Sequence, residues 1–198
     1  MTYLNQKNIE AIAHQTTKQG NTLCGDSYFF AATDEYFICV LADGLGSGKY
    51  ANEASSAVIE VVEQYQHEDV NSIMSRCNEV LFHKRGAAVA VFKVDFIKKE
   101  FVYSCVGNIR FFLYTKNGRL TYPLPVTGYL SGKPQKFHTQ RYPYEGNSKF
   151  LVYSDGINLQ GVKALLKSYM SVERIAEEIK RNHTSHMDDA TFILGSLL

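Results

Sequence analysis

The order in which strand-like and helix-like segments follow one another limits the folds open to this chain of 198 residues. Stretches rich in aromatic and β-branched residues follow one another in pairs, and so do the stretches with helical periodicity. A parallel sheet would need a helix between consecutive strands, and that alternation is absent. We therefore expect antiparallel sheets, each with one face covered by a pair of helices.

The strand signals are clearest in two expected hairpins. The first joins "YFFAA" (28–32) to "YFICVLA" (36–42) through a short polar turn. The second joins 110–115 to 119–124 through Asn117-Gly118, a dipeptide typical of tight hairpin turns. Further strands are expected at 87–96, 101–106, 149–154 and 190–197.

Helical periodicity occurs in two separate places along the chain. Apolar residues recur at helical spacing over 51–65 and 70–81, and again over 161–169 and 171–182. The segment 123–148 holds all four prolines and is expected to be a long loop. With no repeat or linker, residues 1–198 predict a single α+β domain, a four-layer αββα sandwich of two packed, mostly antiparallel sheets.

Charge and composition exclude several classes of protein. A net charge of +1 and a pI near 7.7 indicate no bulk attraction to nucleic acid or membranes. No apolar stretch approaches the ~18 residues of a spanning helix, and the first residues do not resemble a secretory signal. Four cysteines without a CxxC motif are typical of reduced thiols in a cytoplasmic protein. Cys24 could be a nucleophile, but no evident pairing with histidine supports that reading, and core filling is favoured.

Aspartates stand at the ends of four expected strands. Asp26 begins the first strand of the first hairpin and Asp43 ends the second, so the hairpin should bring them to one edge of its sheet. Asp155 ends the strand at 149–154, and Asp188-Asp189 precede the last strand. If those two strands are antiparallel neighbours, their acids also share an edge. Each aspartate alone could be an ordinary turn residue.

Such a cluster of acids is costly unless something offsets its charge. Two carboxylates ~5 Å apart repel by about 3 kcal/mol at an effective dielectric constant of ~20. Several such pairs would rival the whole stability of a domain, about 5–15 kcal/mol. The cluster therefore predicts a cation, protonation or wider separation, and all-oxygen ligands favour Mg²⁺ or Mn²⁺ over zinc.

The glycine-rich stretch "ADGLGSGKY" that contains Asp43 has a second possible function, as a phosphate loop. A Walker loop needs Ser or Thr after its Gly-Lys, and Tyr50 stands there instead. The dinucleotide pattern GxGxxG also fails, because Lys49 occupies the position of the third glycine. The stretch therefore indicates a tight strand-to-helix turn whose main-chain carbonyl could face a metal ion.

Taken in order, these motifs resemble the metal-dependent protein serine/threonine phosphatases of type 2C over nearly the whole chain. The motifs are Cys24-Gly25-Asp26, Ala42-Asp43-Gly44-Leu45-Gly46, Val106-Gly107-Asn108, Ser154-Asp155-Gly156 and Asp188-Asp189-Ala190-Thr191. Each motif alone is weak, but the ordered set is specific. The chain is most similar to the short bacterial phosphoserine phosphatases of the stressosome, the complex that controls the sigma-B stress response.

The resemblance implies a role for each matching residue. Asp43 matches the acid that bridges two divalent cations, Mn²⁺ or Mg²⁺, and the Gly44 carbonyl matches a ligand of the first. Asp155 and Asp188 match ligands of the second, and Asp26 matches an acid that holds the first largely through water. Asp43, Asp155 and Asp188 are thus the expected catalytic residues.

The activity implied by the resemblance is hydrolysis of phosphoserine or phosphothreonine in a phosphoprotein. A water activated by two metal ions would attack phosphorus in line, without a phosphoenzyme. The implied partners are phosphorylated RsbS-like and RsbR-like stressosome proteins, and the implied role is to limit sigma-B signalling.

Three positions depart from the family pattern. Leu45 stands where many members have a histidine that could act as general acid. Asn21 replaces the arginine that binds phosphate, which leaves Lys18, Lys49 and Arg110 as candidates for substrate binding. Asn108 replaces an aspartate, so we expect two metal ions rather than three.

Four other readings stay open. His183 and His186 with Asp188 could bind zinc, although they lack the spacing of the known zinc motif. A phosphatase fold without activity could act as a binding module, and a nuclease or another two-metal hydrolase is also conceivable. A basic, aromatic segment could bind nucleic acid or an acidic partner protein. Its residues are Lys133, Lys136, Phe137, His138, Arg141, Tyr142, Tyr144 and Lys149.

Overall fold

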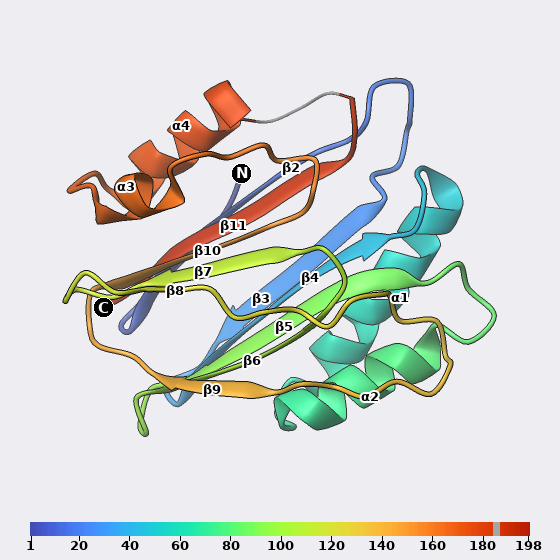
Figure 1. Ribbon diagram of the computed structural model, residues 1–198, viewed down its shortest axis with the longest axis horizontal. Coiled ribbons are helices and arrows are strands. Elements are labelled where there is room, and N and C mark those ends of the chain that lie inside the picture. Colours follow the sequence, from blue (N-terminus) through green and yellow to red (C-terminus); the bar gives the residue numbers. More distant parts are fainter. Residues whose placement is uncertain (184–186) are drawn as a thin grey trace.

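The computed structural model describes residues 1–183 and 187–198, which form two sheets packed face to face with helices on both outer sides (Figure 1). All paired strands run antiparallel. The layers, from one side to the other, are helices, sheet, sheet and helices. This arrangement confirms the predicted αββα sandwich.

The first sheet has the strand order β1-β2-β11-β10-β7-β8 within the described residues. Its strands are β1 (Thr2–Gln6), β2 (Ile9–Thr16), β7 (Arg110–Tyr114), β8 (Leu120–Thr121), β10 (Ser148–Tyr153) and β11 (Ala190–Leu197). As the acid pattern required, β10 and β11 are antiparallel neighbours, with Tyr153 opposite Phe192.

The second sheet has the order β3-β4-β5-β6-β9 within the same described residues. Its strands are β3 (Asp26–Ala32), β4 (Tyr36–Gly44), β5 (Ala87–Asp95), β6 (Glu100–Val106) and β9 (Gln140–Pro143). The pairing of β3 with β4 is the predicted first hairpin.

The helices cover the outer faces in the expected pairs (Figure 1). Helices α1 (Lys49–Tyr65) and α2 (Val70–Val80) pack on the second sheet, and their buried residues form one cluster with Ile38, Val40 and Val89. Helices α3 (Val162–Lys167) and α4 (Val172–His183) pack on the first sheet. In the described residues no helix is both long enough and apolar enough to cross a membrane.

The central position of strand β4 explains why its sequence is a nearly unbroken apolar run. Phe37, Cys39 and Leu41 point into the space between the sheets, whereas Ile38 and Val40 pack beneath α1 and α2. Side chains alternate between the two faces of a strand, so a strand buried on both faces is apolar at every position. The sequence "YFICVLA" is therefore that of a central strand.

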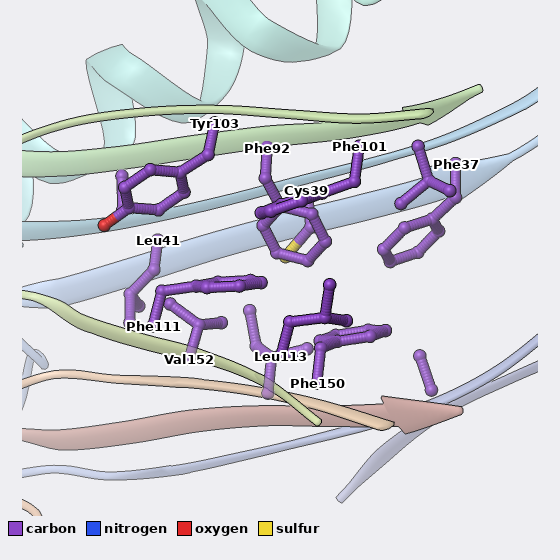
Figure 2. Packing of buried hydrophobic residues seen from close by; sticks show 14 of the residues in the cluster. Phe37, Cys39, Leu41, Phe92, Phe101, Tyr103, Phe111, Leu113, Phe150 and Val152 are labelled. Atoms are coloured by element: carbon purple, nitrogen blue, oxygen red, sulfur yellow. The ribbon is translucent and has the colours of Figure 1, made fainter. Parts of the chain in front are cut away.

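Aromatic rings fill the space between the sheets (Figure 2). Phe92 of β5 is central: its ring centroid lies 5.0 Å from those of Phe111 and Phe150, which come from the opposite sheet. Both pairs have an edge-to-face geometry, the arrangement that aromatic quadrupoles favour. This packing fixes how the two sheets lie on one another, and hence how their ends meet.

The structure also contains strands that the sequence pattern did not predict. Strands β1 and β2 occupy the first 16 residues, for which no element was expected, and β9 lies inside the segment 123–148 that was expected to be a loop. Strand β8 is shorter than the predicted 119–124, because only Leu120 and Thr121 pair with β7.

Candidate active site

The first pair of acids lies at one end of the β3–β4 hairpin. Asp26 is the direct partner of Asp43 in the strand register, as the hairpin geometry predicted. The backbone N–H of Gly44 donates to the carbonyl of Gly25 at 3.1 Å, which continues the pairing beyond β3. Local hairpin geometry is thus sufficient to bring these two carboxylates together.

The second group of acids lies at the matching end of β10 and β11. The backbone N–H of Ser154 donates to the carbonyl of Thr191 at 3.0 Å, so the chain just after β10 lies beside the beginning of β11. Asp155 follows that point and Asp188-Asp189 precede β11. The structure therefore gathers Asp155, Asp188 and Asp189 at one edge of the first sheet.

The two edges face each other across a cavity of about 330 Å³. Carboxylates of both sheets line it, together with the glycine turn after β4. The lining residues are Lys18, Asp43, Gly44, Leu45, Gly46, Ser47, Ala88, Asn108, Asp155, Asp188 and Asp189. We call this cavity the acidic pocket. Asp26 is buried, with 2% of its surface exposed, and does not line the pocket itself.

Hydrogen bonds hold several of these carboxylates in place. Ser154 Oγ donates to Asp26 Oδ2 at 2.6 Å, and Asn108 Nδ2 donates to Asp155 Oδ2 at 2.8 Å. The backbone N–H of Lys18 donates to Asp189 Oδ1 at 2.9 Å. Each of these bonds joins segments far apart in the sequence, so the site is a product of the tertiary fold.

Two buried carboxylate oxygens have no hydrogen-bond partner in the described part of the chain. They are Oδ1 of Asp26 and Oδ2 of Asp189. A buried polar atom without a partner is costly, and such atoms in a native structure often mark a missing water or ion. These oxygens are hard donors of the kind that Mg²⁺ and Mn²⁺ prefer.

The electrostatics of the acidic pocket disfavour a full set of ionised acids. Burial and the neighbouring carboxylates, Asp26 first among them, raise the pKa of Asp43 to about 8. Burial likewise raises the pKa of Asp26 to about 6, despite the hydrogen bond from Ser154. Burial and the charge of Asp188 also raise the pKa of Asp155. The protein alone therefore holds excess negative charge that a bound cation would relieve.

The described side chains do not form a complete metal cage on their own. No group of three or more His, Cys, Asp or Glu residues in the described ranges stands close enough together to hold one ion. Mg²⁺ and Mn²⁺ sites commonly include main-chain carbonyls and several waters besides one or two carboxylates. With its unpartnered oxygens, the donor set fits cations bound partly through water, the mode expected for Asp26.

Two glycines of the site allow close backbone packing. A methyl group on Gly44 would collide with the backbone of Ala51 in the first turn of α1, and one on Gly156 would collide with the backbone of Asp189. Neither position has room for a side chain. The glycines that follow Asp43 and Asp155 therefore let α1 and the start of β11 approach the acids.

The three predicted substrate-binding bases lie in different places. Lys18 lines the acidic pocket, with its Nζ 3.8 Å from Asp188 Oδ1. Lys49 is exposed in the first turn of α1, with its Nζ 3.8 Å from Glu53 Oε1, and is not among the lining residues. Arg110 is also absent from the lining and pairs in register with Tyr153.

Sequence reasoning assigned no role to Ser154 or Asp189. Asp189 is 5% exposed and lines the acidic pocket, whereas the side chain of the preceding Asp188 is half-exposed. The repeated acid "DD" before the last strand was the available signal for Asp189. Nothing in the local sequence marks Ser154 as the residue that contacts Asp26.

The other readings of the sequence fare differently. Cys24 is buried, and burial raises the pKa of its thiol to about 12, so it is protonated at neutral pH and unsuited as a nucleophile. His186 and the side chain of His183 lie outside the described residues, so the zinc reading is untested.

Several residues of the basic, aromatic segment make contacts within the fold. Arg141 Nη1 donates to Glu100 Oε2 at 2.8 Å, and Lys149 Nζ donates to the backbone carbonyls of Ser168 and Met170. Phe137 and Tyr142 pack against two different core clusters. These charges and rings are thus used within the fold, whereas Lys133, Lys136 and His138 are exposed.

A larger cavity of about 450 Å³ lies near the turn between β3 and β4, the end of that hairpin away from Asp26 and Asp43. Its lining mixes both signs of charge and includes Lys93, Glu68 and Asp95. Lys93 Nζ donates to the carbonyls of Gln66 and Glu68, so its charge is already engaged. The acidic pocket is the better candidate site, because Oδ2 of its residue Asp189 has no partner in the described chain and the pKa values of its Asp43 and Asp155 are raised.

Comparison with known proteins supports the family expected from the motifs. The family model described as stage II sporulation protein E matches residues 33–196. The phosphoserine phosphatase RsbX of Bacillus subtilis (strain 168) is 47% identical over 191 residues, which is 96% of each chain.

Solved structures show the same similarity in three dimensions. A crystal structure of RsbX in complex with magnesium superposes with a TM-score of 0.96 at 45% identity, covering 100% of this chain and 99% of the other. A second structure comes from work on the bacterial stressosome, a modular system adapted to control secondary messenger signalling. It has a TM-score of 0.87 at 25% identity and covers 96% of this chain and 100% of the other.

Proposed function

The chain belongs to the PP2C-like phosphatases of the stage II sporulation protein E family and is a protein serine/threonine phosphatase, and on this premise we propose how it works and on what it acts. The proposed reaction is hydrolysis of a phosphoserine or phosphothreonine monoester by a water molecule. The proposed site is the acidic pocket. The observation that supports the proposal is that carboxylates from both sheets converge there. Within the described chain, Oδ2 of the lining residue Asp189 lacks a partner, and so does Oδ1 of Asp26, which stands opposite Asp43 in the strand register.

The proposed metal ligands are Asp26, Asp43, the carbonyl of Gly44, Asp155 and Asp188. When bound, two divalent cations, Mn²⁺ or Mg²⁺, would lower the pKa of a water molecule and neutralise the phosphoryl oxygens. The magnesium complex of the similar RsbX supports dependence on a divalent cation. The raised pKa values of Asp43 and Asp26 support the same proposal, because both acids gain from a neighbouring positive charge.

In this scheme some residues of the chain hold the ions and orient the water, and others hold the carboxylates in place. Asp43, Asp155 and Asp188 are the proposed catalytic residues, which hold the ions and orient the water. Ser154 and Asn108 hold Asp26 and Asp155 in fixed rotamers through their hydrogen bonds. Leu45 has no titratable group, so the leaving serine or threonine oxygen would take its proton from water.

The proposed substrates are phosphorylated RsbS-like and RsbR-like stressosome proteins, and the proposed effect is to limit sigma-B stress signalling in the cytoplasm. Support comes from the similarity to RsbX and to the structure from work on the stressosome. Four buried, free cysteines agree with a reducing compartment.

The first experiment tests the chemistry. Purified protein should hydrolyse p-nitrophenyl phosphate with Mn²⁺ or Mg²⁺ and lose activity in EDTA. Asp43→Asn should lower kcat by about 10²-fold or more, because the proposed bridging charge is removed. Asp34→Asn, in the turn between β3 and β4 at the other end of the hairpin, is the matched control and should leave kcat unchanged.

The outcomes of these assays distinguish a phosphatase from a binding module and from another two-metal hydrolase. A wild-type chain without activity on any phosphoester would favour a binding module over an enzyme. Release of phosphate from phospho-RsbS and phospho-RsbR homologues tests the partners. Activity on p-nitrophenyl phosphate without activity on either protein would overturn the partner assignment and leave the reaction standing. Cleavage of nucleic acid would indicate a different two-metal hydrolase.

A further inference from the structure

A guanidinium group lies beside the glycine turn of the acidic pocket. Arg85 is in the loop between α2 and β5, which Figure 1 shows at the same end of the molecule as the end of β4. The backbone N–H of Leu45 donates to the carbonyl of Gly86 at 3.0 Å, and Ala87 pairs with Gly44. Main-chain hydrogen bonds thus fix this loop directly beside the turn that follows Asp43.

The Arg85 side chain itself reaches that turn. A methyl group added to Gly46, which lines the pocket, would lie 2.7 Å from Arg85 Nη1. Gly46 also has a φ of +89°, a conformation that favours glycine. The absence of a side chain at residue 46 therefore leaves the space into which the guanidinium extends.

The charge of Arg85 is not used within the described part of the chain. It has no carboxylate within ion-pair distance there, whereas Lys18 lies near Asp188 and Lys49 near Glu53. The contact that orients it is the ring of Tyr50, whose centroid lies 5.1 Å from the guanidinium carbon. Arg85 is exposed and is held at the pocket rim with its hydrogen-bond donors directed to no acid of that described part.

A phosphate monoester needs such a group. Its dianion adds charge to a pocket that already contains several carboxylates, and arginine presents parallel N–H donors that match phosphate oxygens. Asn21, at the position where an arginine was expected, is neutral. Lys18 and Lys49 each lie near an acid. Arg110 and Arg85 are both outside the pocket lining, but Arg85 Nη1 extends to Gly46, which is part of that lining.

We propose that Arg85 binds the phosphoryl group of the substrate at the rim of the acidic pocket. This inference rests on the proposed function and names a substrate-binding residue for the same site. Tyr50 positions the guanidinium by stacking beneath it, and Gly46 supplies the space between the guanidinium and the turn after Asp43.

The test compares Arg85→Met, Arg85→Lys and Lys84→Met. The methionine keeps an apolar stem on Tyr50 and removes the charge, and Lys84 is an exposed cation next in the same loop. Two measurements are made with Mg²⁺: kcat and KM for a phosphoserine peptide, and Kd for inorganic phosphate by calorimetry. Melting temperatures confirm that each variant is folded.

Arg85→Met should raise both KM and the phosphate Kd by about 10–100-fold, the worth of hydrogen bonds to a charged group. Arg85→Lys should recover part of that loss, and Lys84→Met should change both values by less than about twofold. Unchanged phosphate affinity in Arg85→Met, or an equal loss in Lys84→Met, would overturn the inference. A wild-type chain inactive on all phosphoesters would instead refute the proposed function, and the calorimetry would still decide whether Arg85 binds phosphate.

Discussion

Ser154 shows how one hydroxyl group connects the two halves of the site. Its Oγ donates to Asp26 Oδ2 at 2.6 Å and accepts from the backbone N–H of Thr191 at 2.9 Å. Asp26 belongs to the second sheet, whereas Ser154 and Thr191 belong to the end of the first. All three residues are buried, so water cannot replace the hydroxyl without entering the core.

Replacing Ser154 with alanine should therefore destabilise the protein. A buried N–H and a buried carboxylate oxygen would lose a partner, which costs about 1–3 kcal/mol for each unsatisfied group. Urea unfolding of Ser154→Ala should show a free energy of unfolding lower by at least about 1 kcal/mol. Ser47→Ala, in the pocket lining, is the matched control and should stay within about 0.5 kcal/mol of the wild type. Equal stability of the two variants would contradict the bridging role.

At the residue scale, sequence reasoning succeeded where the contact was local. The facing positions of Asp26 and Asp43 followed from the turn between them, because a short hairpin fixes which residues stand opposite. It gave no role to Asp189, although that residue is more buried than Asp188. Which of two adjacent acids is buried depends on how β11 enters the sheet, and that depends on β2 and β10.

At the scale of elements, the approach of α1 to β4 depends on Gly44. A methyl group there would meet the main chain of Ala51, which cannot move without shifting the first turn of the helix. The helix and the strand also share a buried cluster that includes Ala54 and Val58 of α1. The position of α1 relative to the acidic pocket is therefore set by the absence of one side chain.

Gly44→Ala should lower the melting temperature and weaken metal binding together. Overpacking of this kind costs about 1–3 kcal/mol, or more when the clash is with backbone. Thermal unfolding and Mn²⁺ titration of the same sample would measure both effects. Gly146→Ala is the control, because a methyl group there has its nearest neighbour, Leu198 O, at 3.8 Å. A normal metal affinity in Gly44→Ala would show that the turn after Asp43 adapts without help from α1.

The elements that escaped prediction lack local signals. Strand β2 contains two alanines and polar residues, and its pairing with β1 and β11 makes it a strand. Strand β9 is a four-residue edge strand that ends in Pro143 and pairs with β6 alone among the described strands. Strand propensity is weak in such segments, and pairing with distant residues decides their conformation.

At the scale of the whole molecule, the acidic pocket should make the stability of the fold depend on pH and on bound metal. The pKa of Asp43 is about 8 and that of Asp26 about 6 in the folded protein, both above the ordinary value of 3.8. The folded chain therefore binds more protons than the unfolded chain between about pH 4 and pH 8. Stability from these groups is present at low pH and is lost as the pH rises through 6 and 8.

In EDTA, the melting temperature should fall between pH 6 and pH 8.5. A loss of about 1 kcal/mol corresponds to roughly 2–4 °C in a chain of this size. Mg²⁺ should reduce that fall, since a cation replaces the protons, and Asp43→Asn should flatten the dependence in EDTA. Melting curves by circular dichroism at matched ionic strength measure all three. A melting temperature that rises with pH in EDTA would contradict the electrostatic account of the pocket.

The acids of the pocket come from opposing sheets whose relative position is set by the aromatic layer around Phe92. Neither sheet alone carries all of the proposed metal ligands. Turnover should therefore depend on how the two sheets are aligned, because a change in the packing around Phe92 that shifts one sheet against the other would also separate the proposed ligands. Core substitutions far from any aspartate should therefore be tested by kcat as well as by melting temperature. A small change in the alignment of the sheets would lower kcat even where the melting temperature hardly changes.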